Sequence, residues 1–150
     1  MKLNKDLYNG ELNNYQLPLG WNISFPQSFQ YEYDNEEQIS IFYLSDNDLT
    51  FRVSEIRAQK DGINAPEQFM REAYINSISK GMIKGRFKNV RIKDFESEGY
   101  IGEYSENGKS VYRVSFGIFT VGNLLLINIF STNKKMVTES MVYINTVYRR

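Results

Sequence analysis

The chain of 150 residues contains neither cysteine nor histidine. The lack of cysteine excludes disulfide bonds, a thiol nucleophile and thiolate metal sites. The lack of histidine removes the most common general base near neutral pH, together with Ser-His-Asp sites and His-ligated zinc. Lysine, tyrosine and carboxylate side chains could still support acid–base chemistry. Catalysis is therefore the less favoured class of function, and no cofactor or metal is expected.

Net charge and a membrane-spanning segment are lacking as well. The 18 Lys and Arg residues balance the 18 Asp and Glu residues, which removes the global electrostatic argument for binding nucleic acid or an anionic membrane. Met1–Gly20 has no apolar core of the roughly 7 to 15 residues that a signal peptide needs, so we expect a cytoplasmic protein. The apolar run Leu124–Phe130 is far shorter than the roughly 20 residues of a transmembrane helix, and no membrane insertion is expected.

Aromatic residues are abundant by contrast, at 15% with 11 Tyr and 10 Phe, which argues against disorder. No long linker rich in Pro, Ser or Gly divides the chain. We therefore expect a single domain over residues 17–150, preceded by a polar and loosely held segment over residues 1–16.

Two apolar segments, Val111–Thr120 and Leu124–Phe130, predict the central hairpin of a sheet, with Gly122-Asn123 in its turn. The second segment is apolar at every position except Asn128, which is typical of a strand buried on both faces. Alternate positions of the first segment form an apolar face. They are Tyr112, Val114, Phe116 and Ile118. The residues predicted as core are Trp21, Phe116, Ile127 and Ile144.

Further strands are predicted from alternation and from turn residues. Residues 17–26 read as a short edge strand, because Pro18 and Pro26 bound the alternating Trp21, Ile23 and Phe25. The remaining strands are Ile39–Leu44 and Leu49–Arg57 joined across Ser45–Asp48, then Val90–Phe95, and Tyr100–Ser105 followed by the turn Glu106–Lys109.

Two helices are predicted. Asn64 as N-cap with Pro66 and Glu67 in the first turn predicts a helix that runs to Lys80. A second helix over Asn133–Tyr148, with Thr132 or Asn133 as its N-cap, is expected to bury one face. That face comprises Val137, Met141, Ile144 and Tyr148.

This order of elements predicts an α+β fold, an antiparallel sheet with helices packed on its faces. The opening Leu17–Pro26, the Asn-Ala-Pro-Glu helix start at 64–67, Gly99-Tyr100, the long apolar pair and the terminal helix resemble the PsbP-like superfamily. That superfamily includes the photosystem II extrinsic protein and a Ran-release factor. The resemblance implies an α-β-α sandwich whose members act mostly as non-catalytic partners of other proteins.

Charged residues gather in two segments. The acidic cluster lacks the Asp-x-Asp-x-Asp-Gly spacing of a calcium loop, so we predict a solvated loop that is a candidate partner-binding site. The basic cluster lacks P-loop and RNP motifs, and it is a candidate partner-binding or anion-binding site within a helix-to-strand connection. The acidic cluster is Glu32, Asp34, Glu36 and Glu37, and the basic cluster is Lys84, Arg86, Lys88, Arg91 and Lys93.

Three functions remain open from the sequence. The favoured one is a non-enzymatic protein-binding module, such as an adaptor or the neutralising partner of a toxin, whose partner is another protein. The first alternative is an anion or nucleic-acid binder that uses the basic cluster, which predicts a steep salt dependence. The second is a carboxylate-based enzyme, for which the candidates are Glu55, Glu72 and Glu103.

Overall fold

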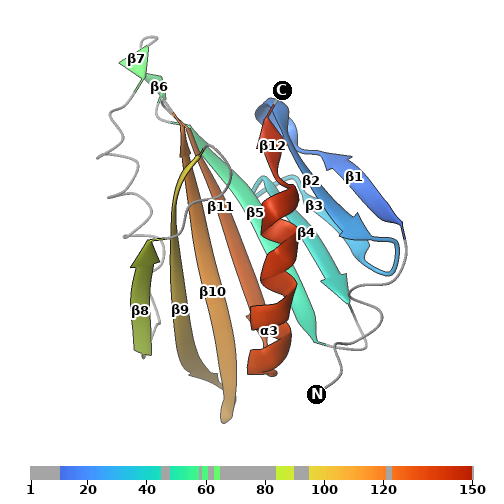
Figure 1. Cartoon of the computed structure of the whole chain (residues 1–150), viewed down its shortest axis with the longest axis vertical. Coiled ribbons are helices and arrows are strands. Elements are labelled where there is room, and N and C mark those ends of the chain that lie inside the picture. The colour runs from blue at the N-terminus through green and yellow to red at the C-terminus, as the bar shows by residue number, and fades with distance from the viewer. Residues whose placement is uncertain are drawn as a thin grey trace.

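The computed structural model describes residues 11–44, 48–57, 59–60, 63–64, 84–89, 95–120 and 123–149. These residues form a large seven-stranded antiparallel sheet, a small three-stranded antiparallel sheet, a separate pair of short strands and one α-helix (Figure 1). The helix and the small sheet pack on the same face of the large sheet, and the main hydrophobic core lies between them. The predicted antiparallel α+β fold is therefore confirmed, but the described part of the chain has a helix on one face only.

The large sheet has seven strands in the order β3-β4-β5-β11-β10-β9-β8, and all neighbouring strands are antiparallel. Within this sheet, the described pair that joins the most distant parts of the chain is β5 with β11. The strands are β3 (Gln30–Asp34), β4 (Ile39–Leu44), β5 (Leu49–Arg57), β8 (Lys84–Asn89), β9 (Glu96–Glu106), β10 (Lys109–Thr120) and β11 (Asn123–Ser131). Two short strands, β6 (Gln59–Lys60) and β7 (Ile63–Asn64), pair separately.

The strands β10 and β11 form the predicted central hairpin. Phe116 pairs with Ile127, which pairs in turn with Val53 of β5, so an apolar row crosses three strands on the face toward the helix. Leu124 and Leu126 are buried on the opposite face. The prediction that this strand is buried on both faces is thus confirmed.

The sequence predicts the turn before β10 correctly but assigns Asn123, which follows β10, wrongly. Asn107 and Gly108 have φ values of 52° and 79°, as a type I′ turn requires, so the predicted Asn-Gly turn between β9 and β10 is confirmed. At the other end, Thr120 pairs with Asn123. Asn123 therefore belongs to β11, so the prediction that it lies in the turn was wrong, and Gly122, the other residue of the predicted turn, lies outside the described residues.

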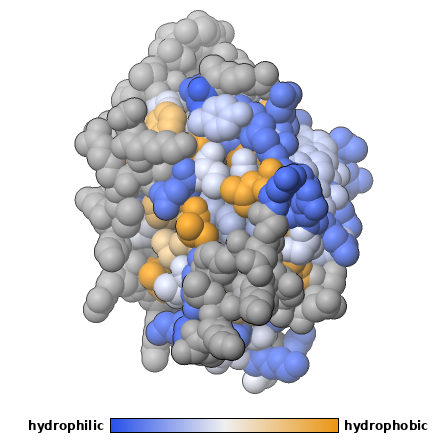
Figure 2. All heavy atoms as spheres, turned by 45° about the vertical axis from the view of Figure 1, so that its right-hand side comes forward, coloured by the Kyte–Doolittle hydropathy of each residue, from blue (hydrophilic) through white to orange (hydrophobic). Residues whose placement is uncertain are grey.

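The small sheet has the order β1-β2-β12, with β1 at Leu12–Gln16, β2 at Trp21–Pro26 and β12 at Tyr148–Arg149. The prediction that β2 is an edge strand was wrong, because strands from both ends of the described chain pair with it. The strand is also shorter than predicted, since Pro18–Gly20 forms a 3-10 turn. In Figure 2 the right-hand side of Figure 1, where the small sheet lies, is turned toward the viewer, and hydrophilic residues predominate on the right of that view.

The C-terminal helix begins as predicted and ends early. Asn133 caps α3 (Lys134–Ser140), because its side-chain oxygen accepts hydrogen bonds from the backbone N–H groups of Lys135 and Met136. A 3-10 segment, η2 (Met141–Thr146), follows. The prediction of a helix to Tyr148 with that side chain buried was wrong, since Tyr148 is 40% exposed in β12.

Thr146, the last residue of η2, gives a physical reason why the helical segment stops before Tyr148. Its hydroxyl donates to the Tyr143 carbonyl at 2.7 Å and accepts from the Ser24 N–H at 2.9 Å. A threonine hydroxyl that bonds to nearby backbone competes with helix continuation, and here it also joins the end of η2 to β2. The next residues can then pair with β2 as β12.

Aromatic side chains fill the core between the layers. The ring of Phe25 on β2 lies 4.3 Å from that of Phe42 and 4.9 Å from that of Phe51, centroid to centroid. The residues predicted as core are confirmed, because none is more than 1% exposed. They are Trp21, Phe116, Ile127 and Ile144.

Two predicted elements fall largely outside the described residues. Of the helix predicted at 64–80, only Asn64 is described, and it belongs to β7. Of the strand predicted at 90–95, only Phe95 is described; it forms an isolated bridge before β9. The predicted strand at 100–105 is confirmed within β9.

Replacing Ile127 by Ala should lower the free energy of unfolding by roughly 2 to 5 kcal/mol, the usual loss for a fully buried aliphatic side chain. Ile101→Ala is the matched control, because Ile101 is 42% exposed on β9. Urea unfolding of both variants measures the difference. A loss of less than about 1 kcal/mol for Ile127→Ala would contradict the central position of β11.

Candidate functional site

The acidic cluster lies at one edge of the large sheet. Glu32 and Asp34 belong to β3, the first strand in the order, and the turn after it carries Glu36 and Glu37. The prediction of a loop was wrong for the first two residues, although all but the partly buried Asp34 are exposed, as expected. Tyr31 and Tyr33 alternate with the acids, a pattern that already favours a strand.

Asp34 shapes the turn that follows β3. Its carboxylate oxygen Oδ1 accepts hydrogen bonds from the backbone N–H groups of Glu36 at 2.9 Å and Glu37 at 3.1 Å. This is the local side-chain bonding by which aspartate stabilises turns. Gln38 then takes a positive φ of 56° and leads the chain into β4. The acidic side chains are therefore presented by a defined hairpin.

The basic cluster begins at the opposite edge of the same sheet. Lys84, Arg86 and Lys88 occupy alternate positions of β8, the last strand in the order, which pairs with β9. The prediction of a plain connection is wrong for 84–89, whereas Arg91 and Lys93 lie outside the described residues. Two clusters of opposite charge, well separated in the sequence, thus belong to opposite edges of one sheet.

A tyrosine holds Glu32 against the sheet. The hydroxyl of Tyr43 on β4 donates a hydrogen bond of 2.9 Å to Glu32 Oε1. This bond to the carboxylate, with smaller contributions from burial and from the negative charge of Glu32, raises the pKa of Tyr43. The bond connects Glu32 on β3 to the neighbouring strand β4.

Two tyrosines of β3 lie on the face opposite to Glu32. Tyr31 and Tyr33 are 41% and 38% exposed, which is high for large side chains. The ring of Tyr31 nevertheless contacts Phe42 at 4.8 Å and Tyr15 at 5.2 Å between centroids. Tyr31 is therefore positioned by the edge of the core while part of its surface remains accessible.

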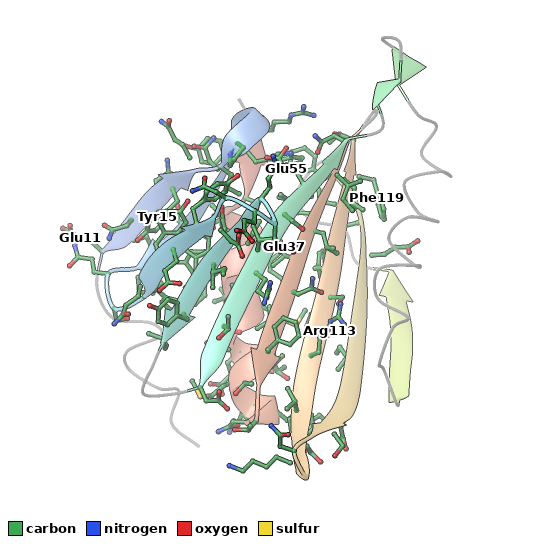
Figure 3. All side chains as sticks on the ribbon, turned by 180° about the vertical axis from the view of Figure 1, so that it is seen from behind. Glu11, Tyr15, Glu37, Glu55, Arg113 and Phe119 are labelled. Atoms are coloured by element: carbon green, nitrogen blue, oxygen red, sulfur yellow. The ribbon has the colours of Figure 1, made fainter. Side chains whose placement is uncertain are left out.

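A pocket of about 180 Å³ lies beside this hairpin. It is bounded by residues of three chain segments: Leu17 and Pro18 before β2, Tyr33 and Gln38 at the hairpin, and Val53 and Glu55 on β5. Figure 3 shows Glu55 and Glu37 at the same part of the molecule, whereas Glu11 points away at the outer side of the small sheet. The sequence named Glu55 but gave no sign of the pocket.

A hydrogen-bonded chain of buried groups leads to Glu55. The indole Nε1–H of Trp21 donates to Asn123 Oδ1 at 3.0 Å, and Asn123 Nδ2 donates to Glu55 Oε2 at 3.3 Å. Because indole is a donor only, it fixes which end of the Asn123 amide faces Glu55. The guanidinium of Arg149 lies 5.4 Å from the centre of the Trp21 ring and donates to Thr120 Oγ1.

The carboxylates considered for catalysis do not form a pair. Glu55 is in register with Leu125, Ile118 and Ser97, whereas Glu103 is in register with Tyr112, six positions further along. Strand spacings place the two acids about 14 Å apart across the sheet and about 20 Å along it. Glu72 lies outside the described residues. Among the residues that the structure describes, no group of acids could hold a metal ion.

The opposite face of the large sheet has a polar cluster that the sequence did not indicate. Arg113 donates from Nε and Nη2 to Asn128 Oδ1 at 3.2 and 3.0 Å, and the fully buried Ser115 donates to the same oxygen. The guanidinium also lies 5.5 Å from the centre of the Phe130 ring. Figure 3 faces this side of the sheet, with Arg113 labelled. These mutual contacts give the cluster a structural role between β10 and β11.

Comparison with known proteins identifies the fold. No family model and no curated protein sequence matches the chain. A protein from Bacteroides thetaiotaomicron VPI-5482 is similar over 91% of this chain, with a TM-score of 0.70 and 14% identity, and the chain spans 48% of that protein. In the described residues, no helix combines the length and apolar character needed to cross a membrane.

Two further structures match nearly end to end. Cyanobacterial PsbP from Synechocystis sp. PCC 6803 has a TM-score of 0.56 and 11% identity, over 95% of this chain and 94% of its own. A protein of unknown function from Pseudomonas aeruginosa, described as a candidate regulator, has a TM-score of 0.57 and 14% identity, over 94% of this chain and 99% of its own. The chain therefore has a PsbP-like fold, which confirms the resemblance in its sequence.

Replacing Asn123 by Ala should lower the free energy of unfolding by roughly 1 to 3 kcal/mol, because the buried indole N–H of Trp21 loses its acceptor. Asn145→Ala, at an exposed position of η2, is the matched control and should change stability by less than about 0.5 kcal/mol. Trp21 is the only tryptophan, so its fluorescence reports unfolding at this site. Equal stability of the two variants would contradict a structural role for the bond.

Proposed function

We propose that this protein is a non-enzymatic protein-binding module that takes up a basic, extended segment of a partner protein along β3. The observation that carries this proposal is the composition of that edge strand. On β3, exposed tyrosines alternate with carboxylates, and none of the described strands pairs with its outer edge. An adaptor or a toxin-neutralising partner would use such a surface.

The physical argument has three parts. An edge strand offers unpaired backbone N–H and C=O groups, to which an extended segment can add as a further strand. Tyrosines such as Tyr31 and Tyr33 are enriched at protein interfaces because they bury apolar area and keep a polar end. Carboxylates such as Glu32 and Asp34 repel acidic segments and steer basic ones toward the edge.

The carboxylate geometry supports binding rather than catalysis. The separation of Glu55 from Glu103 leaves no described pair of acids to share general acid and general base roles. The description of the similar Pseudomonas protein as a candidate regulator is compatible with a non-catalytic partner. The alternative function, an anion or nucleic-acid binder that uses the basic cluster, is favoured only by the alternate spacing of Lys84, Arg86 and Lys88 on the opposite edge.

Glu32→Lys should slow association with the partner by about tenfold or more and weaken its salt dependence, since steering depends on the local charge. The control is Glu11→Lys, which changes net charge equally at an exposed position outside β3. The immobilised wild-type protein is used to retain partner proteins. The rates at which these partners associate with the wild type and with each variant are then measured. Thermal unfolding should show a change in stability within about 0.5 kcal/mol.

Two results would contradict the proposal. One is equal binding by Glu32→Lys and Glu11→Lys while charge reversal at Lys84 removes binding, which would favour the basic cluster. The other is turnover of a small substrate that disappears in Glu55→Gln, with partner binding unaffected by either charge reversal. That second result would establish catalysis instead.

A further inference from the structure

Glu55 occupies a position that the fold otherwise gives to apolar side chains. Leu49, Phe51 and Val53 precede it at alternate positions of β5, and all three are at most 2% exposed in the core. The next residue of this series is a carboxylate, partly buried and lining the pocket. A carboxylate in such surroundings is costly unless hydrogen-bonded, so its position calls for a physical explanation.

The surrounding structure fixes one side of this carboxylate. The Trp21 to Asn123 to Glu55 hydrogen-bond chain orients the Asn123 amide so that its NH2 group faces Glu55 Oε2. Trp21 and Asn123 are 0% and 2% exposed, so two buried side chains support the acid from behind. Glu55 is therefore held in place at the wall of the pocket.

The size and the walls of the pocket restrict its ligand. A volume of about 180 Å³ is below the roughly 300 to 1,000 Å³ of sites for drug-sized molecules and cofactors, and a single side chain fills such a space. Leu17, Pro18 and Val53 supply apolar walls near the carboxylate. An alkyl chain that ends in a cation matches both features, because such chains pack their methylene groups on apolar surface and keep the charged end at a polar group.

An acidic turn precedes one of the pocket residues in the chain. Gln38 lines the pocket and closes the hairpin turn that carries Asp34, Glu36 and Glu37. Clustered charges of one sign near a concave, partly apolar site concentrate ions of the opposite sign. The acidic turn would therefore draw a cation toward Glu55.

We infer that the Glu55 pocket binds an alkylguanidinium or alkylammonium group, supplied by an arginine or lysine side chain of the segment that docks on β3. This inference rests on the proposed function in that it specifies the anchor residue of the partner. The same chemistry could come from a free small amine, and the experiment distinguishes the two sources.

Binding is measured by calorimetry with three probes. They are a hexapeptide with one arginine among threonines and valines, the same peptide with uncharged citrulline in place of arginine, and free agmatine. The wild type should bind the arginine peptide at least about tenfold more tightly than the citrulline peptide, because a charge-assisted hydrogen bond is lost in the latter. Glu55→Gln, which keeps shape and can still accept from Asn123, should remove that difference.

Glu37→Gln is the matched control, because Glu37 precedes the lining residue Gln38 but does not itself line the pocket. Because Glu37 is exposed, its charge should change the affinity by no more than about threefold. If Glu55→Gln proves unstable, NMR of the unaltered protein is the second measurement: agmatine and the arginine peptide should shift the amide signals of Tyr33, Gln38 and Ser54, which line the pocket.

The outcomes separate this inference from the proposed function. Agmatine binding that depends on Glu55, without binding of the arginine peptide, supports the cation pocket with a free amine as its source and counts against docking on β3. A second outcome is that the arginine and citrulline peptides bind with equal affinity, and that Glu32→Lys weakens this binding whereas Glu55→Gln does not. This result would overturn the inferred cation pocket and leave the proposed function intact. The inferred cation pocket is also overturned if neither agmatine nor the arginine peptide shifts the NMR amide signals of the pocket residues.

Discussion

The packing of β2 on the large sheet is the contact on which the rest of the structure depends. Trp21, Ile23 and Phe25 are fully buried there, and Phe25 stacks on Phe42 of β4. The same strand pairs with β1 on one side and with β12 on the other. It therefore anchors both ends of the described chain, while its buried face covers the core strands. At roughly 25 cal/mol per Å² of buried apolar surface, three such side chains contribute several kcal/mol.

This packing also creates the candidate site. The indole of Trp21 reaches Asn123 at the start of β11, and Asn123 positions Glu55 on β5. The segment that leads into β2 supplies Leu17 and Pro18 to the pocket wall. Core packing and the site thus share the same residues, so the pocket should be as rigid as the core beside it. A rigid site loses little conformational entropy on binding, which favours affinity.

The sequence predicts local features of this fold well. Both hairpins around β4–β5 and β9–β10, the central position of β11 and the Asn133 cap follow from alternation, turn residues and capping over short distances. Features that depend on distant pairing were missed. The central place of β2 requires Arg149 to pair with Trp21, and neither segment carries a local signal for this. The acidic residues were found from composition, but the pocket was not, because it joins positions 17, 38 and 55.

Amide hydrogen exchange of β3 tests the central claim most directly. With the arginine peptide bound, strand addition predicts slower exchange at those amides of Gln30–Asp34 that do not bond to β4, because they acquire acceptors on the peptide. Exchange in α3 should not change. Slower exchange confined to Lys84–Asn89, or peptide binding that leaves every β3 amide unchanged, would contradict docking at this edge of the sheet.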